Sequence, residues 1–137
     1  MENKKGKAED YIQIGELAKK THVTPRTIKH YEEKGLLKPF KKTVGGFRLY
    51  QNDKVKLVER IRQLKKVGFS LKEVKEIEEI NGIVEENILE KINNDELDRM
   101  MKFLQSQLIK TKERLDETIK VKKGLEAIIE FLKQTKT

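Results

Sequence analysis

The sequence contains no cysteine, which excludes disulfides and thiolate metal sites. Its only histidines, His22 and His30, are too few to build a metal site by themselves, so we expect no metal and no cofactor. No apolar run approaches the roughly 18 to 20 residues that a bilayer span needs. The opening stretch, MENKKGKAEDY, lacks the apolar segment of a signal peptide. We therefore expect a cytoplasmic protein without a membrane partner.

The net charge of +8 is concentrated in one part of the chain. Residues 1–80 hold 20 Lys or Arg against 12 Asp or Glu, whereas residues 81–137 hold 11 of each kind. This asymmetry is expected when one part of a protein meets a polyanion and the rest has another task. Lysine-rich solvated faces are also common, so charge alone does not decide between the two interpretations.

The stretch IQIGELAKKTHVTPRTIKHYEEKGLL predicts two short helices joined by a tight turn. Thr24 suits the N-cap of the second helix and Pro25 its first position, where a missing N–H costs nothing. Gly35 is suited to end it. Ile28 and Tyr31 can then pack inward on the first helix.

The start of this second helix carries Arg26, Lys29 and His30 on the outward side. A helix N-terminus offers unpaired N–H groups and a partial positive charge, which favour phosphate. In a helix-turn-helix, the second helix enters the major groove with its N-terminal residues near the bases. The cluster therefore favours DNA binding, although the three side chains could instead form an ordinary solvated face.

A short hairpin is predicted next, because Gly45 and Gly46 separate two potential strands in KPFKKTVGGFRLY. Lys41, Lys42 and Arg48 on this hairpin are suited to phosphate contacts that position a protein without reading sequence. Arg48 could instead pair with a nearby glutamate.

Four further helical segments follow. The first runs from Asn52 to a stop at Gly68, and the second opens at the capping box of Ser70 and Glu73 and closes at Asn81–Gly82. A connecting helix is expected over 81–93. From 94 to 137 we expect a long helix of roughly 25 residues, about 37 Å, followed by a short tail.

This last helix carries heptad spacing that predicts pairing with a second helix. The apolar seam positions are Leu97, Met101, Leu104, Leu108, Leu115, Leu125, Ile129 and Leu132. Thr111, Thr118 and Lys122 interrupt the seam. Gly124 is a candidate break, which leaves open an intramolecular helical hairpin in place of a dimer.

Three stretches, IQIGELAKKTHVTPRTIKHYEEKGLL, GGFRLY and LKKVGFSLKEVKEI, together resemble the DNA-binding domain of the MerR family of bacterial transcription regulators. The resemblance covers about residues 11–80, preceded by an expected disordered tail over 1–10. It implies a mainly α fold: a winged helix-turn-helix with a short β-hairpin wing, two further helices, and a long C-terminal dimerisation helix that forms an antiparallel coiled coil.

The resemblance also implies which residues contact DNA. Lys29 stands where the family usually has arginine, His30 where it usually has tyrosine, and Phe47 lacks the hydroxyl of the usual wing tyrosine. Tyr50 is expected to pack within the domain. The expected DNA-binding residues are Thr24, Arg26, Thr27, Lys29, His30, Tyr31, Lys41, Lys42, Phe47 and Arg48.

Family members bind promoter DNA as dimers, so the resemblance implies a homodimer on an inverted-repeat operator of double-stranded DNA. It further implies distortion of the promoter, which engages RNA polymerase indirectly. A simple repressor, or an architectural protein that recruits a partner, is the alternative. An enzyme has little support, because adjacent carboxylates such as Glu32–Glu33 point to different helix faces and we identify no catalytic residues. The sequence does not indicate a small-molecule effector.

Overall fold

The computed structural model describes residues 10–42 and 44–136 of the chain. The tail expected over 1–10 therefore lies outside the described residues except for Asp10. The chain divides into two compact units, one ending at Glu85 and the other beginning at Glu86.

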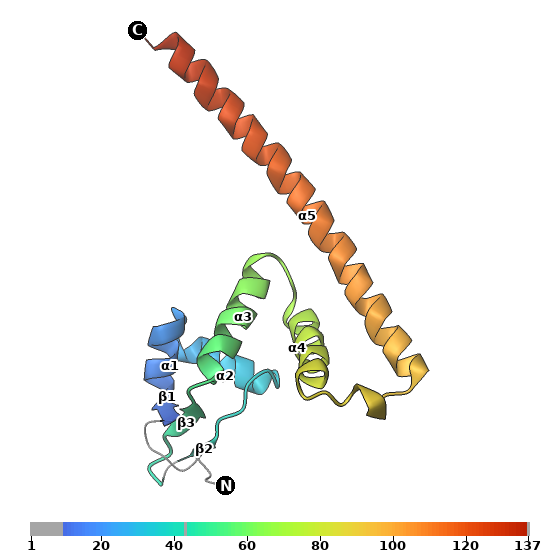
Figure 1. Cartoon of the computed structure of the whole chain (residues 1–137). Helices are drawn as coiled ribbons and strands as arrows, with labels where there is room; N and C mark the ends of the chain where they lie inside the picture. The colour runs from blue at the N-terminus through green and yellow to red at the C-terminus, as the bar shows by residue number, and fades with distance from the viewer. Residues whose placement is uncertain (1–9, 43, 137) are drawn as a thin grey trace. The chain divides into compact units, whose positions relative to one another are not determined.

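The described residues of the first unit form a three-stranded sheet and four α-helices (Figure 1). In chain order they are β1 Tyr11–Gln13, α1 Ile14–Thr21, α2 Pro25–Glu33, β2 Lys41–Lys42, β3 Arg48–Gln51, α3 Lys54–Lys66 and α4 Leu71–Glu85. The second unit contains a 3-10 helix, η3 Leu89–Lys91, and one long helix, α5 Asn94–Thr135. The mainly helical fold with a small hairpin and a long last helix is thus confirmed.

The sheet has the order β1-β3-β2, and both pairings are antiparallel. The hairpin of β2 and β3 was predicted, and Lys42 lies opposite Arg48 in it. Strand β1 was not predicted: Ile12 pairs with Tyr50, far along the chain. A strand of three residues is too short to show alternation, so only the tertiary pairing identifies it.

The expected helix boundaries of the helix-turn-helix are confirmed. The Thr24 hydroxyl accepts a hydrogen bond of 3.1 Å from the Thr27 backbone N–H, and Pro25 occupies the first turn of α2. Gly35 follows the end of α2 with φ of 76°, a left-handed conformation that costs glycine little. These caps fix where α2 begins and ends, and hence which side chains it presents.

The capping box that opens α4 is also confirmed. The Ser70 backbone N–H donates to Glu73 Oε1 at 2.9 Å, and the Glu73 N–H donates to Ser70 Oγ at 3.1 Å. Helix α4 does not end at Asn81–Gly82 as expected but continues to Glu85. Gly82 has no positive φ, so it does not turn the backbone out of the helix as a helix-ending glycine does. An added Cβ there would also meet nothing within 4 Å, so no close contact requires glycine at this position. The connecting helix expected over 81–93 is replaced by the end of α4 and the 3-10 helix η3.

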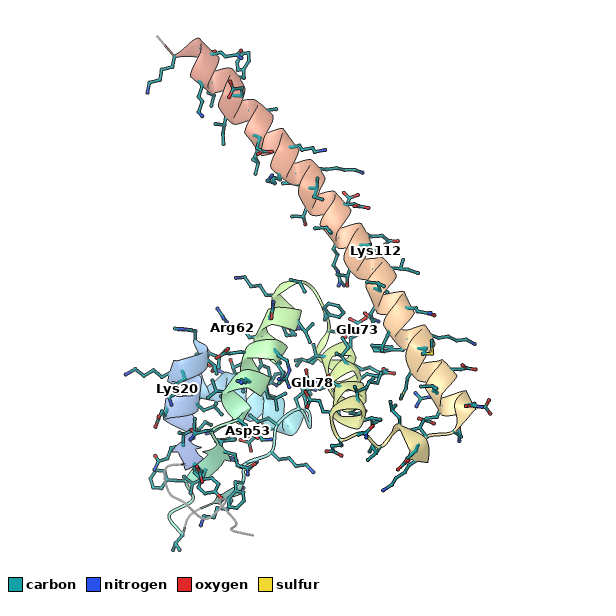
Figure 2. The ribbon with its side chains drawn as sticks, viewed as in Figure 1. Lys20, Asp53, Arg62, Glu73, Glu78 and Lys112 are labelled. Atoms are coloured by element: carbon teal, nitrogen blue, oxygen red, sulfur yellow. The ribbon has the colours of Figure 1, made fainter. Side chains whose placement is uncertain are left out.

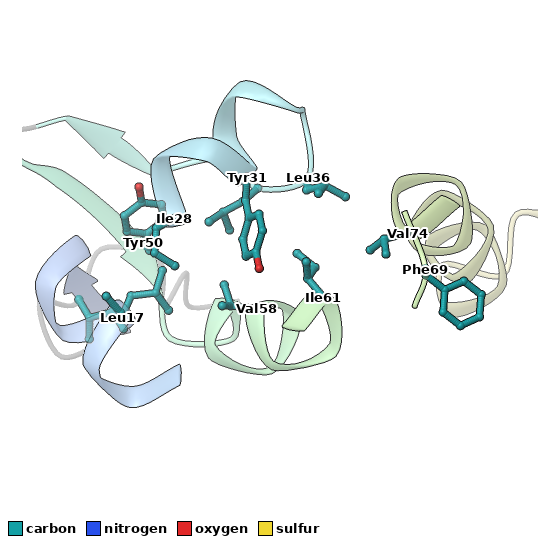
Figure 3. Close-up of a cluster of buried hydrophobic side chains, with 12 residues drawn as sticks. Leu17, Ile28, Tyr31, Leu36, Tyr50, Val58, Ile61, Phe69 and Val74 are labelled. Atoms are coloured by element: carbon teal, nitrogen blue, oxygen red, sulfur yellow. The ribbon is translucent and has the colours of Figure 1, made fainter. Parts of the chain in front are cut away.

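The core of the first unit lies where α1, α2, α3 and the sheet meet (Figure 3). Leu17, Ile28, Tyr50, Val58 and Ile61 are completely buried in it. Phe69 and Val74 extend the same cluster to the start of α4. Helix α2 is therefore held on its inner side by side chains from α1, α3 and β3, which leaves its other side available to a ligand.

Helix α5 is longer than expected, with 42 residues in one uninterrupted helix. At 1.5 Å per residue it spans about 63 Å rather than the expected 37 Å. It passes through Gly124 without a break, so the alternative of a hairpin folded at Gly124 is wrong. Glycine costs a helix interior only about 1 kcal/mol relative to alanine, which the neighbouring turns offset. In the described part of the chain, no helix is both long and apolar enough to cross a membrane.

Candidate nucleic-acid interface

The outward side of α2 carries the predicted basic residues. Arg26, Lys29 and His30 are all exposed, while Ile28 between them is fully buried. This alternation follows from helical spacing, since residues one apart point about 100° away from each other. The structure therefore brings two cations, Arg26 and Lys29, and the imidazole of His30 to the N-terminal two turns of a helix whose other face is fixed in the core.

Two predicted contact residues, Thr24 and Thr27, help to build the helix start. Their hydroxyl groups lie 3.0 Å apart and share a hydrogen bond, in addition to the capping bond from the Thr27 N–H. Thr24 is exposed and Thr27 half-buried. Both side chains therefore lie at the end of α2 where a phosphate would meet unpaired backbone N–H groups.

Tyr31 is placed differently from its neighbours. Its ring is only 6% exposed and lies in the core cluster between α2 and α3 (Figure 3). Burial raises the pKa of its phenol, an effect that the positive charge of Arg62 partly opposes. The packing expected for Tyr31 is thus confirmed. Its place among the DNA-contacting residues has no support, because a buried ring cannot reach a groove without disrupting the core.

A partly buried polar cluster fastens the hairpin to α2. Arg48 on β3 donates from Nε to Glu32 Oε1 on α2 at 3.1 Å, and the Tyr50 hydroxyl donates to the other oxygen of the same carboxylate. The side chain of Glu32 is 14% exposed and that of Arg48 is 29% exposed. Burial, followed by the hydrogen bond to Glu32, raises the pKa of the Tyr50 phenol well above its usual range. We call Glu32, Arg48 and Tyr50 the wing clamp.

The wing clamp bears on two expectations about β3. Arg48 pairs with a glutamate, which was the alternative to a phosphate contact. Tyr50 packs within the domain as the resemblance implied. Sequence reasoning considered a glutamate partner for Arg48 but could not identify Glu32, because 16 residues separate the two and only the fold brings them together.

The other predicted wing residues are exposed. Lys41 and Lys42 form β2, and both side chains are accessible. Phe47, just before β3, is 59% exposed. The hairpin thus presents two cations and one aromatic ring, while the wing clamp holds its inner strand against the helix that carries Arg26 and Lys29.

A second group of basic residues was not predicted. Lys20 and His22, at the end of α1, line a hollow of about 420 Å³ together with Arg62 and Lys66 of α3. Figure 2 shows Lys20 and Arg62 on these two neighbouring helices. Thr21, Glu59 and Gln63 complete the lining. No sequence motif links residues so far apart, so helix packing alone identifies this group.

The predicted seam residues of α5 are exposed in the single chain. The exposed fraction lies between 38% and 59% for each of Leu97, Met101, Leu104, Leu108, Leu115, Leu125, Ile129 and Leu132.

Among residues 10–42 and 44–136, no group of three or more His, Asp or Glu side chains could hold a metal ion.

Comparison with known proteins identifies the family of this architecture. A family model described as MerR HTH family regulatory protein matches residues 12–79. The HTH-type transcriptional regulator ZntR of Escherichia coli is 36% identical over 106 residues, which cover 68% of this chain and 75% of ZntR. The nodulation protein NolA of Bradyrhizobium elkanii is 49% identical over 63 residues, which cover 46% of this chain but only 29% of NolA.

A solved structure agrees with these sequence matches. The crystal structure of a MerR family transcriptional regulator from Bacillus thuringiensis superimposes with a TM-score of 0.59 at 25% sequence identity. The superposition covers 87% of this chain and 96% of that one. The similarity therefore extends beyond the helix-turn-helix to most of the chain.

Proposed function

Because the chain belongs to the MerR family of HTH transcriptional regulators, we propose that it binds promoter DNA as a homodimer and regulates transcription from an inverted-repeat operator. The observation that carries the proposal is the exposed cationic start of α2, whose opposite face is fully buried in the core. A rigid, positively charged helix start is what insertion into a major groove requires.

Each α2 helix is proposed to read one half-site. Arg26 and Lys29 would approach base edges or flanking phosphates, with His30 beside them. Lysine lacks the planar fork with which arginine holds guanine at two points, so Lys29 would discriminate less sharply than the usual arginine. Lys41 and Lys42 would add phosphate contacts that position the domain.

The proposed role of the wing clamp is to hold these two elements in a fixed relation. Glu32 lies on α2, whereas Arg48 and Tyr50 lie on β3. Because β3 pairs with β2, the clamp connects Lys41 and Lys42 to the helix that carries Lys29. Arg48 would therefore act mainly by positioning the wing, with any phosphate contact as a second role.

A second copy of the chain is the proposed partner of the exposed apolar seam on α5. Heptad spacing of apolar residues stabilises a pair of helices, and removing the seam from water is favourable. A homodimer would provide the two DNA-binding heads that an inverted repeat needs. We further propose that the dimer acts by distorting the promoter, which uses the sequence-dependent stiffness of DNA and engages RNA polymerase indirectly.

The DNA contacts can be tested by measuring affinity at several salt concentrations for a promoter fragment selected by binding enrichment. Lys29→Ala is expected to cost about 1–3 kcal/mol and to relax preference at one base position, since it removes a contact near the bases. Lys42→Ala is expected to weaken binding to all sequences and to reduce the salt slope by about one.

Lys123→Ala is the matched control, because Lys123 is an exposed lysine of α5 outside the proposed interface. It should leave affinity and salt slope unchanged. Equal losses for Lys42→Ala and Lys123→Ala would indicate only general charge attraction. Binding without preference for any inverted repeat would favour an architectural protein over a promoter-specific regulator.

The distortion is tested separately by footprinting the promoter with and without RNA polymerase. The proposal expects altered reactivity of the operator centre on binding, because twisting or bending exposes the bases there. An unchanged footprint at the centre, with protection of both half-sites, would leave a simple repressor.

A further inference from the structure

The exposed seam of α5 contains enough chemical detail to specify how two copies would align. We propose that two α5 helices pair antiparallel in one register, in which Leu108 of each copy packs against Leu125 of the other and Asp98 faces Lys133. The proposal rests on the homodimer proposed above and adds the alignment of its two chains. The two-fold axis then lies between Asp116 and Glu117.

The possible registers are few. In an antiparallel pair, each core layer combines the first seam position of a heptad from one helix with the second from the other. Sliding one helix by a whole heptad is therefore the smallest shift that keeps both seams in contact. Besides Leu125, the residues that can face Leu108 within the central part of the helix are Thr118 and Leu132.

The apolar layers favour the proposed register. It pairs apolar residues in three distinct layers and collects the polar seam residues near the axis. The apolar layers are Met101–Leu132, Leu104–Ile129 and Leu108–Leu125, and the central ones are Thr111–Lys122 and Leu115–Thr118. Two-fold symmetry repeats each layer, so the apolar contacts flank a polar centre on both sides.

The other two registers bury less apolar surface. With Leu108 opposite Thr118, Lys122 would face Leu104, and a charged group would have to leave water beside an apolar one. With Leu108 opposite Leu132, Met101 and Leu104 would extend past the apolar residues of the other chain. In the single chain, Leu104, Leu108 and Leu125 are 39%, 53% and 57% exposed, so each has surface to bury.

Charges beside the seam give an independent argument. In the proposed register, Asp98 near the start of one α5 faces Lys133 near the end of the other, an attractive pair. With Leu108 opposite Thr118, Asp98 would face Glu126, and Lys112 and Arg114 would each face their own symmetry mates. Like charges that face each other beside the seam destabilise a helix pair. The flanking charges and the apolar layers therefore both disfavour the register with Leu108 opposite Thr118.

The first experiment is cross-linking, for which the absence of cysteine makes the chain suitable. A Leu108→Cys/Leu125→Cys variant is expected to form intermolecular disulfides or short thiol cross-links under oxidation. Leu108→Cys alone should not cross-link, because the two copies of residue 108 would lie about 25 Å apart along the rod. A Leu104→Cys/Lys122→Cys variant is the control for the alternative register, because these residues face each other there and lie about 10 Å or more apart along the rod in the proposed one.

The second experiment reverses charge and measures dimer dissociation by sedimentation. Asp98→Lys is expected to raise the dissociation constant about threefold or more, since symmetry repeats the broken pair. Adding Lys133→Asp should restore much of the loss. Asp95→Lys is the control. Asp95 lies in the first turn of α5 and outside the seam, so its reversal reports the effect of charge on the helix dipole without a contact across the pair.

The outcomes separate the register from the homodimer. Efficient cross-linking of the Leu104→Cys/Lys122→Cys variant, or tighter association of Asp98→Lys, would overturn this register while leaving an antiparallel homodimer. Efficient cross-linking of Leu108→Cys alone would show a parallel pair. A chain that stays monomeric at all concentrations would overturn the homodimer as well, while the DNA-affinity experiment would still judge the α2 contacts independently.

Discussion

At the scale of single residues, the wing clamp is the arrangement with the clearest energetic role. Glu32 receives hydrogen bonds from Arg48 and from Tyr50, and its carboxylate is mostly shielded from water. A buried charge is costly unless it is paired and hydrogen-bonded, and here both oxygens are engaged. The clamp is therefore expected to be sensitive to loss of its central carboxylate.

Glu32→Ala is expected to lower the free energy of unfolding by about 1–3 kcal/mol, because it leaves the Tyr50 hydroxyl and the Arg48 guanidinium without this partner in a largely buried site. Urea denaturation measures the change. The same variant is expected to weaken DNA binding beyond its effect on stability, since the wing loses its attachment to α2.

Glu33→Ala is the matched control for the clamp. The side chain of Glu33 is 75% exposed, and its Oε2 lies 4.0 Å from Nδ1 of His30. Exposed substitutions of this kind usually change stability by less than about 0.5 kcal/mol. Similar losses for the two variants would show that Glu32 has no special role.

At the scale of secondary-structure elements, side-chain caps mark the starts of α2, α4 and α5. Thr24, Ser70 and Asn93 each accept a hydrogen bond from the backbone N–H three residues later. These bonds satisfy groups that have no partner within the helix. Glycine acts as a stop only where the backbone turns left-handed, as at Gly35 and Gly68, which have φ of 76° and 107°.

Gly124→Ala is expected to stabilise α5 by about 0.8–1 kcal/mol, because alanine loses less backbone entropy in a helix interior. An added Cβ at this position would meet nothing within 4 Å, so no contact opposes the gain. Thermal unfolding followed by circular dichroism, at fixed protein concentration, measures the effect.

Ala127→Gly is the reverse control within the same helix and should destabilise it by a similar amount. Both positions lie outside the seam, so dimer formation should persist in both variants. Loss of helix or of the dimer in Gly124→Ala would show that this glycine bends α5 in solution.

At the scale of the whole molecule, charge and apolar surface are assigned to different parts. The basic excess belongs to residues 1–80, while residues 81–137 are neutral overall. The neutral part includes the exposed seam of α5. This division suits a protein in which one part attracts DNA and the other associates with its own copy without strong like-charge repulsion.

Lys122 is the one charged residue in the seam and is expected to limit the strength of the dimer. Its side chain is 70% exposed and lies 3.6 Å from Glu126 in the single chain. Lys122→Leu is expected to lower the dimer dissociation constant roughly tenfold or more, because a polar seam residue costs stability and leucine adds apolar contact. Analytical ultracentrifugation measures the change.

Lys123→Leu tests whether the seam matters for that gain. Lys123 adjoins Lys122 but points away from the seam, so leucine there should leave the dissociation constant unchanged. Equal tightening by both substitutions would indicate nonspecific association of added apolar surface rather than a defined helix pair.

The features that depend on neighbouring residues could be predicted from the sequence. Thr24 and Pro25, and the Ser70–Glu73 capping box, marked helix starts because capping acts over three residues. The outward position of Arg26, Lys29 and His30 followed from helical spacing next to the apolar Ile28 and Tyr31. The same local patterns led to the family, which the match over residues 12–79 then established.

The features that depend on residues far apart became visible only in the folded chain. Pairing with β3 created strand β1, and packing of α2 against the sheet gave Arg48 its partner Glu32. Burial of Tyr31 removed it from the proposed contacts, although its spacing also allowed it a place beside them. Local patterns specify which face a side chain occupies, but long-range packing determines what that face meets, since such contacts form only when the whole domain has folded.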